Sequence, residues 1–267
     1  ARSIAYYNDT ILNNAILEKQ LVGDFDQALK EKQFCMYLQP QMTSEGKMLG
    51  AEPLVRWQHP KRGLIFPGDF IEVFEKTGLI YRLDRVIWEL AVQKLARWQQ
   101  EGHSALYISV NISTKDFYYM NVYETITALV EKYRIIPSTL KLEITETAIM
   151  TGTAGELDMI EQFREYGFQV EIDDFGSGYS SFNTLKDMDV DVLKIDMGFL
   201  RTSKPENLEK SMSILNMIIS LSKTLGLSVV TEGVETKEQV VKLSQMGCGI
   251  YQGYYFSKPI PVEEFEK

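Results

Sequence analysis

This sequence contains few histidines and cysteines, and it carries no net positive charge. With 2 histidines and 2 cysteines in 267 residues, a histidine-rich zinc or iron site is hard to build. Cys35 and Cys248 are far apart and form no CxxC pair, which argues against structural zinc and favours a reducing compartment. The 28 basic residues are outnumbered by 37 acidic ones, for a net charge of −9. Duplex nucleic acid is therefore not an expected partner, and a phosphate-bearing ligand would need local lysine, arginine or metal ions.

Long apolar runs are also missing. None reaches the roughly 18 residues that a membrane-spanning helix needs, and no secretory signal is visible. The longest candidate, LNMIISLSKTLGLSVV, is interrupted by Ser222, Lys223 and Thr224. The opening ARSIAYYNDTILNN has no initiator methionine, which indicates a piece of a longer protein. We expect a cytoplasmic domain without membrane contact of its own, and leave open whether the full-length protein is tethered to a membrane.

Short apolar, β-rich runs alternate with amphipathic stretches from residue 34 onward. The runs predict strands at 34–39, 48–57, 106–112, 140–145, 168–174, 190–196, 227–232 and 249–256. Strands that alternate with helices in this way are typical of an α/β fold, the (β/α)8 or TIM barrel. The first two strands are joined only by QMTSEGK, which is too short for a crossover helix. We therefore predict a modified TIM barrel with its first strand antiparallel to the others.

Ahead of the strands, residues 8–33 carry apolar side chains at roughly helical spacing. They are Ile11, Leu12, Ala15, Ile16, Phe25 and Leu29. We predict a helix here that leads into the domain proper. Residues 1–24 would form a connector from an upstream domain, and residues 25–267 the functional domain.

Polar side chains recur at the carboxyl ends of the predicted strands, where barrels carry their chemistry. They are Glu52, Arg56, Asn111, Glu143, Glu146, Asp173, Asp174, Lys194, Asp196, Glu232 and Gln252. Several carboxylates in one mouth repel one another unless something cationic binds among them. A set of oxygen ligands with one Asn carbonyl suits Mg²⁺ or Mn²⁺, with Ca²⁺ as a competitor.

Each of these residues also has a structural interpretation. A single strand-end Asp or Glu is often a loop cap or a solvated charge. Lys194 stands in the apolar stretch VDVLKID, where an unpaired ammonium is costly, so it should pair with carboxylates or hold a water. Arg56 would either pair with a strand-end acid or contact phosphate or guanine. Glu235 would either join the site or cap the helix that follows it.

A set of short blocks then carries a family resemblance. The blocks are LQPQ, GAEPLVRWQHP, VNIS, LEITET, IDDFGSGYSS, LKID, TEGVET and QGYYFSKP. In this order and spacing, from about residue 25 to residue 265, the chain resembles the EAL-domain phosphodiesterases, which hydrolyse the bacterial second messenger cyclic di-GMP. The opening YYNDTILNN also resembles the exit from a GGDEF diguanylate-cyclase domain. The resemblance implies a GGDEF–EAL parent protein with upstream regulatory domains, and a homodimer.

The resemblance also implies roles for the matched positions. One divalent metal would be held by Glu52, Asn111, Glu143 and Asp173, and a second by Asp173, Asp174 and Glu232. Lys194 matches the lysine that contacts the attacking water, and Glu235 and Gln252 complete the site. Substrate contacts fall on Gln39, Leu54, Arg56 and Gln252. Glu146 matches the glutamate that anchors the loop after the fifth strand.

The implied reaction opens one phosphodiester bond of cyclic di-GMP to give linear pGpG. Two Mg²⁺ or Mn²⁺ ions would activate the water and stabilise the displacement, and Ca²⁺ is expected to inhibit. Either Asp174 or Lys194 would assist proton transfer from the water. Because the residues leave both possibilities open, we predict neither as the main acceptor.

One departure from the family pattern falls in its name-giving motif, which here reads Glu52-Pro53-Leu54. Proline removes a backbone donor and fixes φ, although alternation should point its ring away from the face of Glu52. Since every matched charged ligand is present, we predict an active enzyme. The alternatives are a domain that binds cyclic di-GMP or a partner protein without turnover, and another Mg²⁺-dependent barrel such as an enolase-like lyase.

The adjacent Asp173 and Asp174 pose a geometric problem, because neighbouring side chains on a strand point to opposite faces. Gly176 and Gly178 follow closely and would let the chain turn there. We predict that Asp173 bridges two metals from the strand end, while Asp174 reaches the second metal from the start of the loop.

Overall fold

The computed structural model describes residues 9–175, 190–196, 198 and 205–267. Its strands are β1 (Phe34–Met42), β2 (Met48–His59), β3 (Gly63–Ile65), β4 (Tyr107–Ile112), β5 (Leu140–Thr145), β6 (Gln169–Asp173), β7 (Val192–Asp196), β8 (Ser228–Glu232), β9 (Ile250–Tyr251) and β10 (Ile260–Pro261). Its helices are α1 (Asp9–Lys30), α2 (Pro67–Thr77), α3 (Ile80–Gln100), α4 (Thr114–Tyr119), α5 (Val122–Tyr133), α6 (Glu146–Thr151), α7 (Ala154–Tyr166), α9 (Pro205–Thr224), α10 (Lys237–Met246) and α11 (Val262–Phe265), with a 3₁₀ turn at Pro137–Thr139.

The barrel closes in the order β1-β9-β8-β7-β6-β5-β4-β2, and β2 then pairs back with β1. Strand β1 is antiparallel to both of its neighbours, β2 and β9. All other neighbouring strands around the barrel are parallel. The predicted modified TIM barrel with a reversed first strand is therefore confirmed, as are the positions of all eight predicted strands.

Three strands differ from the sequence-based expectation. Strands β3 and β10 are short additions that pair with β2 and β1 outside the closed ring, and runs of this length give no periodic signal. The last barrel strand, expected over 249–256, covers only Ile250–Tyr251. The chain leaves the barrel at Gly253, where a Cβ would lie 2.2 Å from the carbonyl oxygen of Val234. Only glycine tolerates so close a backbone approach.

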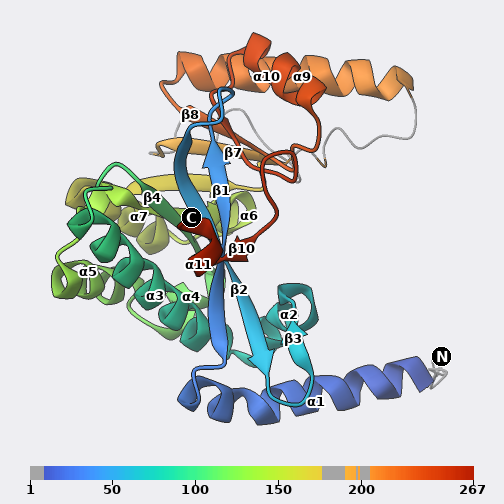
Figure 1. Ribbon diagram of the computed structural model, residues 1–267, viewed down its shortest axis with the longest axis vertical. Helices are drawn as coiled ribbons and strands as arrows, with labels where there is room; N and C mark the ends of the chain where they lie inside the picture. Colours follow the sequence, from blue (N-terminus) through green and yellow to red (C-terminus); the bar gives the residue numbers. More distant parts are fainter. Residues whose placement is uncertain (1–8, 176–189, 197, 199–204) are drawn as a thin grey trace.

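The β1–β2 hairpin extends beyond the barrel and organises a second core. Figure 1 shows this hairpin running the length of the molecule, with α1, α2 and β3 gathered at one end. The main core fills the barrel wall and the space beneath its helices. The second core is built around an aromatic cluster of Phe25, Phe34, Trp57, Phe70 and Phe74. Its rings pack closely, with centroids 4.8 Å apart for Phe25 and Phe74.

Helix α1 confirms the helix predicted over residues 8–33 and has two unlike halves. In its second half, Leu21, Phe25 and Ala28 are buried at helical spacing in the aromatic core. Residues 12–20 are all exposed, including Leu12 at 45%. Whether the first half connects to an upstream domain stays a prediction. Within the described residues, no helix is both long and apolar enough to cross a membrane.

We predict that Phe25→Ala lowers the free energy of unfolding by about 3–5 kcal/mol, because it removes a buried ring and leaves a cavity between α1 and α2. The measurement is urea denaturation followed by tryptophan fluorescence. Leu12→Ala, in the exposed half of the same helix, is the matched control and should cost less than about 0.5 kcal/mol. Equal effects of the two substitutions would show that α1 does not belong to the folded core.

Candidate functional site

The ammonium of Lys194 lies at the centre of a ring of carboxylates inside the mouth of the barrel. Lys194 belongs to β7, and its side chain is 1% exposed. Four carboxylates from four other strands surround Nζ: Glu232 at 2.8 Å, Glu143 at 2.9 Å, Asp173 at 3.3 Å and Glu52 at 3.4 Å. The expectation that Lys194 pairs with carboxylates is confirmed. The parallel strands bring these ends together because their register aligns Asn111 with Glu143 and Asp196 with Glu232.

The charges in this ring shift the pKa values of its members. Burial alone would lower the pKa of Lys194, but the surrounding carboxylates raise it well above its ordinary value. Burial, with the charge of Glu52, raises the pKa of Glu143 well above the usual glutamate range. Burial also raises the pKa of Glu232 to about 8, although Lys194 opposes the shift. Burial therefore favours the neutral forms of Glu143 and Glu232.

Amide side chains close the ring beside Glu52. The Nδ2 of Asn111 donates to Glu52 Oε1 at 3.3 Å, and the Nε2 of Gln252 donates to Glu52 Oε2 at 2.5 Å. Gln39 accepts a longer bond from Gln252, at 3.4 Å. Gln39 comes from the antiparallel strand β1, Asn111 from the parallel strand β4, and Gln252 follows β9. The structure thus brings Gln39, Asn111 and Gln252 together with the carboxylates, as predicted from the sequence.

A second charged layer lies deeper in the barrel. Lys141 Nζ bonds to Glu171 Oε1 at 2.9 Å, and both side chains are buried. The same ammonium lies 3.7 Å from the centroid of the Tyr107 ring. Sequence reasoning missed this layer. Alternation was the available signal, because Lys141 and Glu171 each stand two residues before a site carboxylate on the same face.

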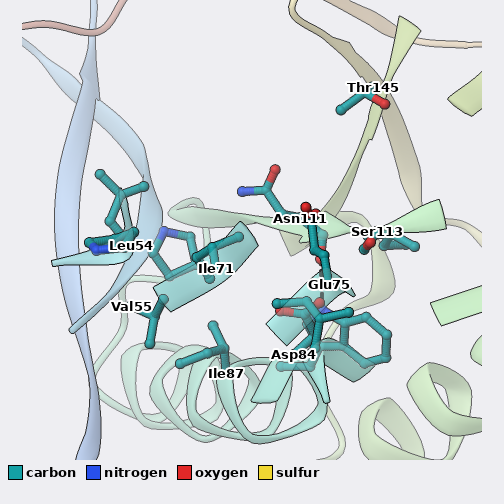
Figure 2. A pocket seen from close by; sticks show the side chains of 14 residues that line it. Leu54, Val55, Ile71, Glu75, Asp84, Ile87, Asn111, Ser113 and Thr145 are labelled. Atoms are coloured by element: carbon teal, nitrogen blue, oxygen red, sulfur yellow. Dashed lines mark hydrogen bonds between the residues drawn. The ribbon is translucent and has the colours of Figure 1, made fainter. Parts of the chain in front are cut away.

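A cavity of about 250 Å³ opens beside the carboxylate ring. Figure 2 shows Leu54 from β2 across this cavity from Asn111 and Ser113 at the end of β4. Its walls are mostly apolar, with Pro53, Val55, Ile71 and Ile87 among them. Two acidic residues from the helices, Glu75 and Asp84, also line it.

Asp84 interacts with the buried Asp116 of α4, and neither was predicted as a site residue. Burial raises the pKa of Asp116 to about 7 and that of Asp84 well above the usual aspartate range, with the neighbouring Asp116 adding to the shift at Asp84. Asp116 also accepts a hydrogen bond from the backbone N–H of Ser113 at 2.8 Å. Among the described residues Asp84 forms no ion pair, and it faces a mostly apolar cavity, which suits a ligand with N–H donors.

Arg56 is buried at the base of the hairpin extension. Its Cζ lies 5.2 Å from the ring centroids of both Tyr37 and Phe66, and Nη1 donates to the carbonyl oxygen of Val55 at 2.9 Å. Its Nε is buried without a hydrogen-bond partner. Among the described residues no carboxylate forms an ion pair with it, so the purely structural interpretation of Arg56 gains no support. The guanidinium keeps an unused donor for an anion.

The predicted residues outside the Lys194 ring include Asp174, Glu146 and Glu235. Asp174 is exposed and adopts a left-handed backbone with φ of 56°, so the chain turns at this aspartate itself, before Gly176. Burial and the adjacent Asp173 raise the pKa of Asp174. Glu146 is buried at the start of α6. The loop it was expected to anchor, with Gly176 and Gly178, lies outside the described residues.

Glu235 is exposed on the segment between β8 and α10. The expectation that it caps the following helix is wrong, because the N-cap of α10 is Thr236. The Thr236 side chain accepts from the backbone N–H of Gln239, and the Gln239 side chain accepts from the backbone N–H groups of Glu235 and Thr236. Thr236 and Gln239 thus form the capping box of α10, and the Glu235 carboxylate is not part of it.

The chemistry of the donor set fits a divalent cation. Four carboxylates share a single ammonium, and Glu143 Oε2 is buried without any hydrogen-bond partner. In the part of the chain that the structure describes, no group of three acidic, histidine or cysteine side chains is arranged to hold a metal ion. The ammonium of Lys194 lies between the four carboxylates. All donors are oxygen atoms, as hard cations prefer.

Comparison with protein families identifies the family to which the chain belongs. The model of the EAL domain matches residues 22–259. The chain belongs to the EAL domain family. Among curated relatives of this EAL domain, it is 35% identical over 260 residues to the bifunctional diguanylate cyclase/cyclic di-GMP phosphodiesterase MucR of Pseudomonas aeruginosa, covering 97% of this chain and 38% of that protein. It is 32% identical over 253 residues to the cyclic di-GMP phosphodiesterase RocR of the same organism, covering 94% of this chain and 63% of that protein.

Solved structures agree with this family. A structure described as the PaMucR phosphodiesterase in complex with c-di-GMP superposes on the EAL domain with a TM-score of 0.86, at 36% identity, covering 92% of this chain and 99% of that one. The EAL enzyme Bd1971, in a form bound to cAMP and cyclic di-GMP, gives a TM-score of 0.85 at 30% identity, covering 96% and 69%. The EAL domain spans 38% and 33% of the lengths of MucR and of NbdA from Pseudomonas aeruginosa.

The raised pKa of Glu232 predicts how the stability of the metal-free EAL domain depends on pH. A carboxyl whose folded-state pKa of about 8 exceeds its unfolded value near 4.5 makes the folded state bind the proton more tightly. Its stabilising contribution is full below the unfolded value and is lost as pH rises toward the folded value. The raised pKa of Lys194 changes the stability only at pH values above the ordinary lysine pKa. It therefore has no effect between the unfolded and folded pKa values of Glu232.

We therefore expect Glu232→Gln to flatten the fall in melting temperature between pH 5 and about pH 8 in EDTA, relative to the unmodified domain. Differential scanning calorimetry at several pH values measures the slope. Glu238→Gln, at an exposed position on α10, serves as the control and should keep the original slope. Parallel slopes for Glu232→Gln and the unmodified domain would contradict the assignment of this pKa shift.

Proposed function

We propose that this EAL domain is a metal-dependent phosphodiesterase that hydrolyses one phosphodiester bond of cyclic di-GMP to give linear pGpG. The observation that carries the proposal is the ring of four carboxylates around Lys194, with a cavity lined by Asn111 and, further along β2, a buried arginine whose Nε has no hydrogen-bond partner. The printed names of MucR and RocR as cyclic di-GMP phosphodiesterases support it. So does the cyclic di-GMP in the complex of PaMucR.

Two divalent cations, Mg²⁺ or Mn²⁺, are proposed cofactors. Glu52, Asn111, Glu143 and Asp173 would hold one, and Asp173, Asp174 and Glu232 the other. When bound, such ions polarise a phosphate oxygen and lower the pKa of a bridging water. Binding would also relieve the repulsion among carboxylates that Lys194 alone does not neutralise.

The side chains of the protein would supply binding and proton handling. Lys194 would hold the attacking water with its ammonium. Asp174 would accept the proton of that water, or Lys194 would assist its transfer through this hydrogen bond. Glu235 is proposed to join the site from the segment after β8. Gln252 and Gln39 would orient the substrate and the carboxylate of Glu52 through their amides.

The substrate would lie between Arg56 and the cavity. The buried Nε of Arg56 would donate to a phosphate oxygen, giving a strong charge-assisted hydrogen bond. The cavity beside Leu54 would receive one guanine between its apolar walls. Asp84 would accept hydrogen bonds from the N1–H and the 2-amino group, and these donors would stabilise its charged form.

A domain that binds cyclic di-GMP without turnover remains the second candidate. The observation in its favour is that Lys194 stands where cations would have to enter, so catalysis requires the carboxylates to turn away from it. The presence of Pro53 is weaker evidence for a domain without turnover. The pairing of β2 with β4 ends at Ala51, so the missing N–H of Pro53 leaves this ladder intact.

Several further properties are proposals at the level of the whole protein. These are a homodimer, upstream regulatory domains such as GGDEF, a cytoplasmic site of action, inhibition by Ca²⁺, and a loop after β6 anchored by Glu146. They follow from the family resemblance and from the greater length of the curated relatives.

The direct test is incubation of the domain with cyclic di-GMP and Mn²⁺, following pGpG by anion-exchange chromatography. We expect turnover in the unmodified domain, suppression when Ca²⁺ replaces Mn²⁺, and a loss of at least about 100-fold in Asp173→Asn and in Lys194→Met. Glu161→Gln, on the exposed face of α7, is the matched control and should keep full activity. Binding of cyclic di-GMP without product would establish the receptor alternative instead.

A second prediction isolates substrate binding. Arg56→Met keeps the apolar stem between Tyr37 and Phe66 but removes the donors, so KM for cyclic di-GMP should rise about 10- to 100-fold, with a smaller effect on kcat. Steady-state kinetics at saturating Mn²⁺ measures both constants. Arg85→Met, at an exposed position of α3, is the control. An unchanged KM in Arg56→Met would remove this arginine from the substrate site.

A further inference from the structure

A chain of hydrogen bonds runs from the floor of the barrel to the carboxylate of Glu52. The hydroxyl of Tyr107 donates to Gln41 Oε1 at 2.6 Å, in a part-buried bond. Gln41 Nε2 donates to Gln252 Oε1 at 2.9 Å, and Gln252 Nε2 donates to Glu52 Oε2 at 2.5 Å. These last two bonds are buried, and Gln41 is 0% exposed. We call Tyr107, Gln41, Gln252 and Glu52 the relay.

The charge at one end sets the direction of every bond in the relay. A carboxylate only accepts hydrogen bonds, so Gln252 must turn its NH₂ group toward Glu52 and its carbonyl oxygen toward Gln41. Gln41 must then offer its own NH₂ to Gln252, which leaves its carbonyl oxygen for a donor. Only a hydroxyl that donates completes the chain, and Tyr107 supplies it. An amide flip anywhere in the relay would place two acceptors face to face.

The ring of Tyr107 is held so that its hydroxyl reaches Gln41. The Lys141 ammonium lies 3.7 Å from the ring centroid on the barrel floor. On strand β2, Gly50 leaves room for the ring, because a Cβ there would lie 2.5 Å from Tyr107 Cδ2. The ring thus packs closely against Gly50 and beside the Lys141 ammonium, in the position that brings its hydroxyl to Gln41.

We propose that Tyr107 and Gln41 are positioning residues, which fix the amide of Gln252 and thereby hold Glu52 in the orientation that binds a divalent cation. This inference rests on the proposed function, in which Glu52 is a metal ligand. Neither residue contacts substrate in the proposed site, and both act through Gln252. Hydrogen-bond partners of metal ligands commonly change metal affinity about 10- to 100-fold when they are removed.

The test measures Mn²⁺ binding by isothermal titration calorimetry, without substrate, for the whole 267-residue chain. Tyr107→Phe deletes only the hydroxyl and keeps the ring on Lys141. Gln41→Met keeps the length of the side chain and deletes both amide bonds. The control is Tyr251→Phe, which removes an equally short buried bond, from the Tyr251 hydroxyl to the Cys248 carbonyl oxygen at 2.6 Å, on the strand next to Gln252.

We expect each relay variant to raise the Kd for Mn²⁺ about tenfold and the control to leave it within about twofold. The double variant Tyr107→Phe/Gln41→Met should show no further loss, because both residues act through the same bond to Gln252. Melting temperatures identify any variant that fails to fold, and the second single variant then carries the comparison.

Three outcomes would overturn the relay: wild-type affinity in either folded single variant, additive losses in the double variant, or an equal loss in Tyr251→Phe. Absence of Mn²⁺ binding by the unmodified chain would overturn it as well. The failure of the proposed hydrolysis is distinguishable. In that case the unmodified chain binds Mn²⁺ but yields no pGpG, and the Mn²⁺ affinities alone still decide the relay.

Discussion

The barrel mouth depends on one constraint, the neutralisation of four carboxylates by a single buried ammonium. Lys194 lies within 3.4 Å of Glu52, Glu143, Asp173 and Glu232, each from a different strand. Removing charges from water costs free energy, and one positive charge does not compensate four negative ones. Burial raises the pKa values of Glu143 and Glu232, which favours their neutral forms and reduces this deficit. An added cation, as proposed for the divalent metal ions, would reduce it further.

The reversed first strand contributes two amides near this ring. The four carboxylates come from β2, β5, β6 and β8, whereas β1 runs antiparallel to its neighbours β2 and β9. It places Gln39 at the level of Glu52 and Gln41 one layer below, where neutral amides do not add to the repulsion. Beneath them, Lys141 and Glu171 neutralise each other and support Tyr107. The carboxylates therefore lie above a layer of polar groups in which Glu171 Oε1 pairs with Lys141, while Glu171 Oε2 is buried without a hydrogen-bond partner.

The long hairpin links this mouth to the second core. Strand β2 carries Glu52 in the barrel and then Leu54 and Arg56 toward the aromatic cluster around Trp57. The packing of α1 and α2 against this extension positions the cavity wall and the buried guanidinium.

The sequence by itself determined the barrel, the reversed first strand and the strand-end residues, because alternating apolar runs and the short connection after residue 41 leave few other topologies. It also identified Lys194 as a residue needing carboxylate partners. Only the tertiary structure decided which residues meet across strands: the pairing of Lys141 with Glu171, the contact of Tyr107 with Gln41, and the Asp84–Asp116 pair beside the cavity. It also decided that Thr236 rather than Glu235 caps α10, and that the chain turns at Asp174 itself. These contacts depend on register and on helix placement, which local sequence patterns do not encode.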